Sequence, residues 1–151
     1  MARQLLIKVY SHRGEKIHVL FDVYGTISIK NGERQRREAE NSEFHIAGPD
    51  QKPRQSGAQL TRNGNFKDAF ARFLMVEWRT DHYFSILGRK EVFLSHGGYC
   101  IQLSADVNEN VVVFEPIHLQ GKHEEADTLI GFHMVNMMVI SWFVHLTPMS
   151  W

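Results

Sequence analysis

The sequence predicts a mixed α/β domain, and three features of its hydrophobic pattern carry this prediction. A short apolar run of strand type covers 17–23 and is followed by a turn and a polar stretch. Apolar residues at helical spacing fill "FKDAFARFLMVEW", residues 66–78. Two alternating runs around Gly97-Gly98 are typical of a β-hairpin. Strands and helices that alternate in this way favour a mixed or mainly parallel sheet flanked by helices.

Size and composition indicate one intracellular domain, 1–151. The chain has 151 residues, enough for a single hydrophobic core. Lys+Arg and Asp+Glu both number 17, so any polyanion binding must come from a local patch of charge. The one cysteine, Cys100, excludes an intramolecular disulfide and a multi-cysteine zinc site, and it indicates a reducing cytoplasmic or nuclear compartment. The apolar run at the N-terminus is too short for a signal peptide or a membrane span, so we expect no membrane partner.

The N-terminal half predicts a strand, a turn, a helix and a loop. Asp22 lies at the end of the first strand, and Gly25 breaks that strand. Ser28 can cap a helix whose polar turns carry several arginines. The stretch 43–65 holds three glycines and two prolines among polar residues, so we expect a long flexible loop there.

The C-terminal half predicts alternating helices and strands. In the helix 66–78 we interpret the aromatic stripe as core packing, because an amphipathic helix needs an apolar face. The elements expected after it are a hairpin of strands 92–95 and 99–103, a short buried strand 110–116, a helix 121–134 and a last strand 136–143.

Three carboxylates gather at the expected start of the helix 121–134, directly after His123. They are Glu124, Glu125 and Asp127, and Glu124 and Asp127 share one helix face. Paired carboxylates can bind Mg²⁺ or Mn²⁺, which take oxygen ligands. In α/β proteins ligands gather at the carboxyl ends of strands, so Asp22 and this group could converge. The alternative is plain capping, because acidic residues at a helix start gain about 0.3–1 kcal/mol each from the helix dipole.

Two blocks of the sequence resemble a known pattern. "VLFDVYGTISIKNGERQRR" and "HEEADTLIGFHM" are similar to a widespread group of uncharacterised animal and mobile-element proteins, in which "VFDxY…SIK…ER…RR" precedes "HEEADTR". That group resembles the PIN-like and flap-endonuclease-like nuclease fold. The resemblance implies a divalent-metal-dependent nuclease that binds nucleic acid and hydrolyses phosphodiesters with two metal ions.

The resemblance also implies roles for particular residues. Asp22 would be the first catalytic metal ligand, and Glu124 or Glu125 with Asp127 would be the ligands on the helix. The basic residues implied as phosphate contacts are Lys30, Arg34, Arg36 and Arg37.

The sequence departs from this pattern in two places. Leu129 stands where the group has an arginine, and the expected "DTD" pair is replaced within "MMVISWFVHLTPMSW". We therefore expect a PIN-like domain that is truncated at its C-terminus, with an inserted hairpin and with impaired hydrolysis. Exposed aromatic residues in the last segment, Trp142, Phe143 and Trp151, predict self-association.

Other interpretations of the same residues remain open. The chain could be a non-catalytic protein or nucleic-acid interaction module, with "ERQRRE" as a solvated helix face, or a remnant without selected activity. A single zinc ion on His123, Asp127 and His133 is a further alternative, although His133 lies six residues beyond Asp127, on a different helix face. We expect His133 and His145 to be packed or surface residues. Cys100 has no evident base beside it, so a thiol nucleophile is not expected.

Overall fold

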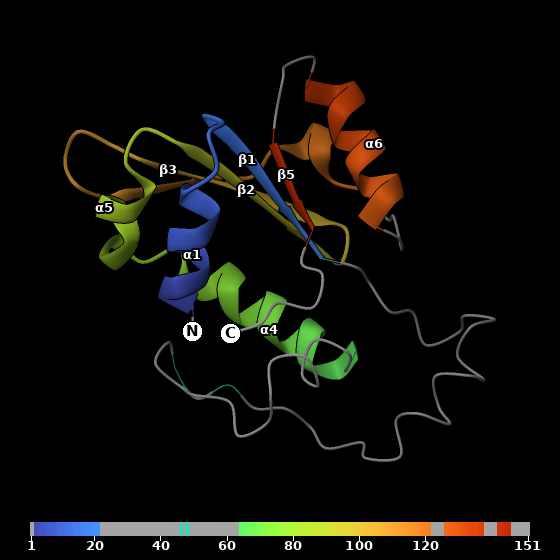
Figure 1. Cartoon of the computed structure of the whole chain (residues 1–151), viewed down its shortest axis with the longest axis horizontal. Helices are drawn as coiled ribbons and strands as arrows, with labels where there is room; N and C mark the ends of the chain where they lie inside the picture. Colours follow the sequence, from blue (N-terminus) through green and yellow to red (C-terminus); the bar gives the residue numbers. More distant parts are fainter. Residues whose placement is uncertain are drawn as a thin grey trace.

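A five-stranded mixed sheet forms the centre of the molecule (Figure 1). The computed structural model describes residues 2–21, 46, 48, 64–121, 126–137 and 142–145. The strands are β1 (Lys16–Leu20), β2 (Glu91–His96), β3 (Tyr99–Ala105), β4 (Val111–Phe114) and β5 (Trp142–His145). The helices are α1 (Ala2–Tyr10), α4 (Gly64–Glu77), α5 (Phe84–Leu87) and α6 (Ala126–Met137), with 3₁₀ turns η1 (Asp81–Tyr83) and η2 (Ile117–Leu119).

The strand order is β4-β3-β2-β1-β5, with parallel and antiparallel halves. β1 pairs in parallel with both β2 and β5. β3 pairs antiparallel with both β2 and β4. The expected α/β class with a mixed sheet is therefore confirmed. The expected hairpin is present as β2 and β3, and β2 is the central strand of the sheet. That this hairpin is an insertion into a PIN-like fold stays a prediction.

The tight turn between β2 and β3 follows from its two glycines. Gly97 and Gly98 have φ angles of 61° and 87°, in the region that side chains disfavour. A two-residue turn with both φ values positive matches the twist of the two strands. It sets His96 opposite Tyr99 and thereby fixes the register of the hairpin.

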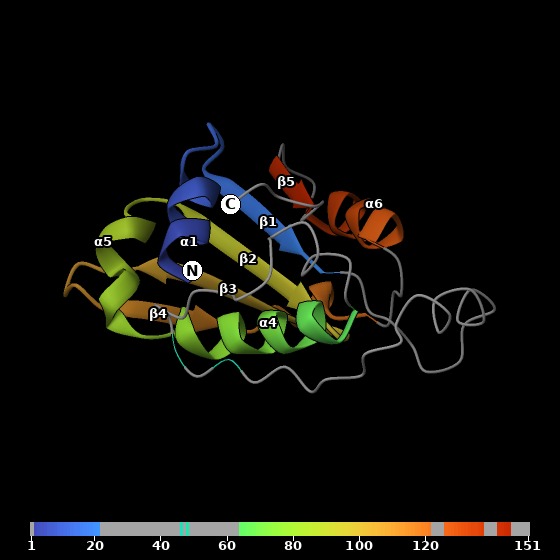
Figure 2. The same cartoon turned by 60° about the horizontal axis from the view of Figure 1, so that its bottom comes forward.

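Helices cover both faces of the sheet (Figure 2). On β1, Ile17 and Val19 belong to the main core, which they share with α1 and α4. His18, between them, points to the opposite face, because side chains alternate along a strand. There it contacts His133 of α6. A smaller cluster on this second face joins Phe93, Cys100, Leu119 and Met137.

The aromatic stripe of α4 is core, as the sequence predicts. Phe66, Phe70 and Leu74 lie on one side of the helix and are buried. Trp78 follows the last turn, is fully buried, and donates its indole N–H to the carbonyl of Ala2 at 3.3 Å. This bond ties the end of α4 to the start of α1.

Several boundaries differ from those expected. Helix α1 was not predicted, although its buried residues recur at helical spacing: Ala2, Leu5, Leu6 and Val9. The strand expected over 17–23 ends at Leu20. The strand expected over 136–143 is misplaced at its start, because 136 and 137 belong to α6. Its last two residues, 142 and 143, lie in β5 (Trp142–His145). The loop expected over 43–65 is wrong at its end, since α4 begins at Gly64.

Other expectations lie outside the described residues. These are the helix after Ser28, most of the loop 43–65 and Trp151. The backbone of β5 is described, but the side chains of Trp142, Phe143 and His145 are not. Self-association through these aromatic residues therefore remains a prediction.

Candidate functional site

The carboxyl ends of the parallel strands β1 and β2 lie at the same edge of the sheet as the start of α6. The carboxyl ends of β1 and β2 lie together, since Leu20 pairs with Ser95 and the next residue, Phe21, donates its N–H to the Ser95 carbonyl at 3.1 Å. Helix α6 precedes β5, which is parallel to β1, and the helix begins at this same edge (Figure 1). Edges of this kind are where α/β proteins bind ligands.

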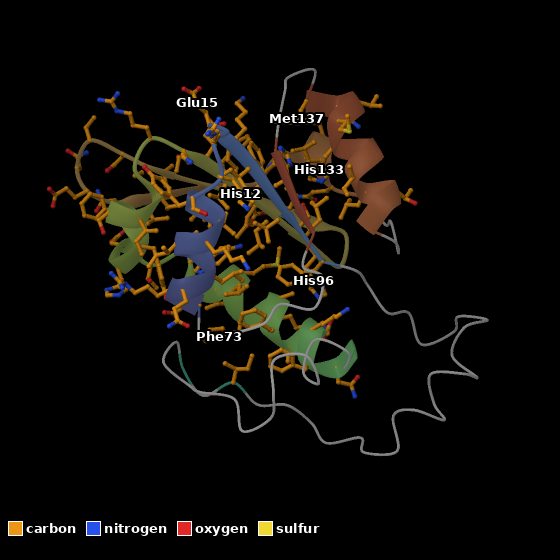
Figure 3. The ribbon with its side chains drawn as sticks, viewed as in Figure 1. His12, Glu15, Phe73, His96, His133 and Met137 are labelled. Carbon is orange, nitrogen blue, oxygen red and sulfur yellow. The ribbon has the colours of Figure 1, made fainter. Side chains whose placement is uncertain are left out.

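A histidine–carboxylate pair lies at this edge. His96, the last residue of β2, has its Nε2 atom 2.8 Å from Oδ1 of Asp68 on α4. The second oxygen of Asp68 accepts from Nε of Arg72 at 2.9 Å, one helical turn along. The histidine is buried, whereas Asp68 is partly exposed and Arg72 is exposed. The pair therefore connects the partly exposed Asp68 of α4 with the carboxyl end of β2, where Figure 3 labels His96.

The ring of His96 also contacts the ring of Phe21, the residue that directly follows β1. The Phe21 and His96 rings meet edge to face, with centroids 6.2 Å apart. Asp22 is the next residue in the sequence after Phe21. His96 thus contacts Phe21, the residue that precedes the predicted metal ligand Asp22 in the sequence.

Most of the site residues predicted from the sequence lie outside the described residues. Asp127 is the second residue of α6, and its backbone is described but its side chain is not. The predicted residues outside the described ranges are Asp22, Lys30, Arg34, Arg36, Arg37, His123, Glu124 and Glu125. In the part of the chain that is described, no group of three or more His, Cys, Asp or Glu side chains is arranged to hold a metal ion.

A second polar cluster is buried between the sheet and α6. Nδ1 of His18 and Nδ1 of His133 lie 2.8 Å apart, so one ring donates its N–H to the other. Nε2 of His133 lies 3.3 Å from Oγ of Ser95. The ring of His18 stacks on the ring of Phe93, with 4.5 Å between the ring centroids. Both histidines are fully buried. This confirms that His133 is packed, and it disfavours the zinc alternative because both ring nitrogens face the sheet.

Burial keeps His18 and the neighbouring Cys100 in their neutral forms. Burial, followed by the nearby His133 and Lys16, lowers the pKa of His18 from 6.5 to about 3. Cys100 lies opposite Ser95 in the hairpin, and burial raises the pKa of its thiol to about 11. A neutral buried thiol is a poor nucleophile, in agreement with the expectation for Cys100.

Sequence reasoning missed His96 and Asp68 as a pair. They are 28 residues apart, on a strand and a helix that meet only in the fold. The available signal was the position of His96 at the end of an apolar strand, where a buried polar residue needs a partner.

Comparisons with known proteins do not place the chain in a family. No family model, curated protein or solved structure matches it. The resemblance to PIN-like nucleases therefore remains a prediction from the two sequence blocks. Within the described residues, no helix combines the length and the apolar character needed to cross a bilayer.

Proposed function

We propose that the chain is a divalent-metal-dependent, nucleic-acid-binding domain of PIN-like nuclease type with impaired phosphodiester hydrolysis. The observation that carries this proposal is the shared edge formed by the end of β1 and the start of α6. Asp22 follows Phe21 directly in the sequence, and Asp127 is the second residue of α6. The carboxyl ends of parallel strands are a frequent place for a bound ligand, and a helix start beside them favours an anion such as phosphate.

The proposed chemistry uses oxygen ligands and nearby positive charge. Asp22, Glu124, Glu125 and Asp127 would hold Mg²⁺ or Mn²⁺, which keep several water molecules in their coordination shells. The cation would polarise a phosphoryl oxygen and lower the pKa of a bound water. The side chains proposed to neutralise the phosphate backbone are Lys30, Arg34, Arg36 and Arg37.

The absent "DTD" pair supports impaired hydrolysis. Two-metal hydrolysis needs ligands for both ions, so that the attacking and leaving oxygens are stabilised together. A site with fewer carboxylates can still bind one cation and the phosphate backbone. We therefore propose that this chain keeps metal-dependent binding of nucleic acid, whereas its hydrolysis of phosphodiesters is impaired.

A binding experiment tests the proposal through Asp22. Titration of Mn²⁺ into the Asp22→Asn variant should show an affinity lower by about tenfold or more, because one carboxylate ligand is lost. Metal-stimulated binding of a fluorescent single-stranded oligonucleotide should fall with it. Glu15→Gln is the matched control, since Glu15 precedes β1 at the opposite edge of the sheet and should leave both affinities unchanged (Figure 3).

The stability of the metal-free variants separates this proposal from the interaction-module alternative. Removing one carboxylate from a crowded acidic cluster should raise the stability of the metal-free protein, because like charges repel at close range. If Glu124→Gln instead costs about 0.5–2 kcal/mol and leaves metal affinity unchanged, the acidic group is a helix cap. The interaction-module interpretation would then replace the nuclease-like one.

A further inference from the structure

The outer edge of β4 carries backbone groups that no neighbouring strand uses. β4 is the last strand of the sheet on the side away from β5 (Figure 2). Val111 donates its N–H to Oδ1 of Asp81 at 2.8 Å and not to β3. Backbone bonds alternate in direction along an antiparallel strand, so the N–H and C=O groups of Val113 also point away from β3. In the part of the chain that the structure describes, these two groups have no partner.

The side chains of β4 suit a second strand beside it. Val112 and Phe114 are exposed on one face of the strand, whereas Val111 and Val113 pack against the main core. An aromatic side chain next to a β-branched one on the neighbouring strand makes a favourable pair. Pro116 ends the edge, because proline has no N–H to donate to a further strand. The free edge is therefore short and apolar.

Charges of opposite sign lie at the two ends of this edge. Arg79, which follows α4, has Nη2 3.6 Å from Oε1 of Glu115, directly after the end of β4. Asp81 lies at Val111, at the start of β4. When a second β4 runs antiparallel to the first, the end of one strand lies beside the start of the other. Arg79 of each copy then meets Asp81 of the other copy, so the edge is complementary to itself.

We propose that the partner of this edge is a second copy of the chain, whose β4 pairs antiparallel with the first about a two-fold axis at Val113. The N–H and C=O groups of each Val113 then bind those of the other copy. Val112 of each copy packs against Phe114 of the other, because these residues flank the axis. The same surface is used on both copies, so the contact closes as a dimer and does not continue into a fibre.

The two-fold pairing also gives new partners to the groups at both ends of the edge. Glu115 of the first copy lies opposite Val111 of the second, since each is two residues from the axis. The carbonyl of Glu115 accepts the N–H of Val111, which frees the carboxylate of Asp81. A guanidinium has five N–H donors, so Arg79 of the first copy can hold both its own Glu115 and the freed Asp81. Acidic and basic residues are equal in number, so the net charge does not oppose association.

Sedimentation equilibrium of the whole chain and of charge-reversed variants tests the proposal. Arg79→Glu and Asp81→Arg each place like charges together at both ends of the contact, and each should raise the dissociation constant of the dimer about tenfold or more. The double variant exchanges the two charges and should bring the dissociation constant back to within about threefold of the wild type. Arg13→Glu is the matched control, since Arg13 is exposed in the turn before β1, three strands away from β4.

Hydrogen exchange of single amides shows whether β4 is the contact. The N–H of Val113 should exchange about tenfold more slowly above the dissociation constant than below it, because pairing protects this group from solvent. The N–H of Val112 points to β3 in the single copy and serves as the internal control, with an exchange rate that should not change. Exchange at Val113, together with Arg79→Glu, decides the question even if Asp81→Arg does not fold.

The outcomes do not depend on the proposed function, because neither measurement involves a metal ion or a nucleic acid. A chain that stays monomeric at millimolar concentration overturns the proposal. A dimer in which exchange at Val113 is unchanged, or which the folded double variant does not recover, is formed through another surface and also overturns it. Slow exchange at Val113 and recovery in the double variant establish pairing through β4.

Discussion

At the scale of single residues, the pair of His18 and His133 makes the stability of the fold depend on pH. The two rings share one hydrogen bond, with 2.8 Å between their Nδ1 atoms, and neither ring is exposed. This geometry needs one nitrogen with a proton and one without. If both rings were charged, two N–H groups would face each other in a site that water cannot screen. The attachment of α6 to the sheet therefore requires that at least one of the two rings is neutral, and burial keeps His18 in that state.

Acidification should destabilise the protein through His18. Its pKa is lowered to about 3 in the fold, so between 6.5 and 3 the unfolded chain binds more protons than the folded one. The contribution to stability is complete above pH 6.5 and is lost as the pH falls towards 3, at up to about 1.4 kcal/mol per pH unit. Urea unfolding at several pH values measures this slope.

Variants of His18 and His133 show how much of the pH dependence of the unfolding free energy these two histidines cause. His18→Leu alone should cost about 1–3 kcal/mol at pH 7.5, because it takes a partner from the buried His133. The double variant with His133→Leu should recover most of this loss and flatten the slope between pH 6.5 and 5. An unchanged slope in the double variant would assign the acid sensitivity to carboxylates elsewhere.

At the scale of elements, the sequence predicts well those helices and strands whose pattern is local. α4 has its apolar residues at helical spacing, and the hairpin of β2 and β3 has two glycines where the turn needs positive φ. α1 was missed because it covers only nine residues, a stretch too short for the helical period to be distinguished from a strand. The last strand was misplaced because "NMMV" is apolar enough for either a strand or a buried helix.

The buried face of α4 should carry most of the contribution of this helix to stability. Leu74 is fully buried and Val76, two residues on, is 71% exposed. Leu74→Ala should cost about 2–5 kcal/mol, since it leaves a cavity in the main core. Val76→Ala on the same helix should change stability by less than about 0.5 kcal/mol. Equal effects in chemical unfolding would show that α4 is not packed on the sheet as described.

At the scale of the whole molecule, the edge strand β4 exposes an apolar surface. β4 lies at one end of the strand order, and its residues Val112 and Phe114 are 43% and 59% exposed. Ile117, in the following turn η2, is 83% exposed. Edge strands with apolar side chains pair readily with other strands. The described residues therefore offer a surface for association that is separate from the predicted C-terminal aromatic segment.

A charge on β4 should suppress this association. Phe114→Lys should raise the concentration at which the protein begins to associate, because a lysine on an edge strand blocks pairing with a second strand. Sedimentation velocity over a range of concentrations measures the change. Val135→Lys is the control, since Val135 is exposed to 76% but lies on α6 and not on a strand edge. An equal effect of both variants would indicate a general gain in solubility and not pairing through β4.

The sequence by itself determined the α/β class, the core face of α4 and the turn of the hairpin. Each depends on residues that are neighbours in the chain, so periodicity and glycine positions are sufficient. Only the tertiary structure decided that β2 is the central strand, that His18 meets His133 across 115 residues, and that Asp68 orients His96. These contacts form between segments far apart in the chain. They depend on which strands pair and on which face of the sheet each helix covers, and a local pattern of residues predicts neither.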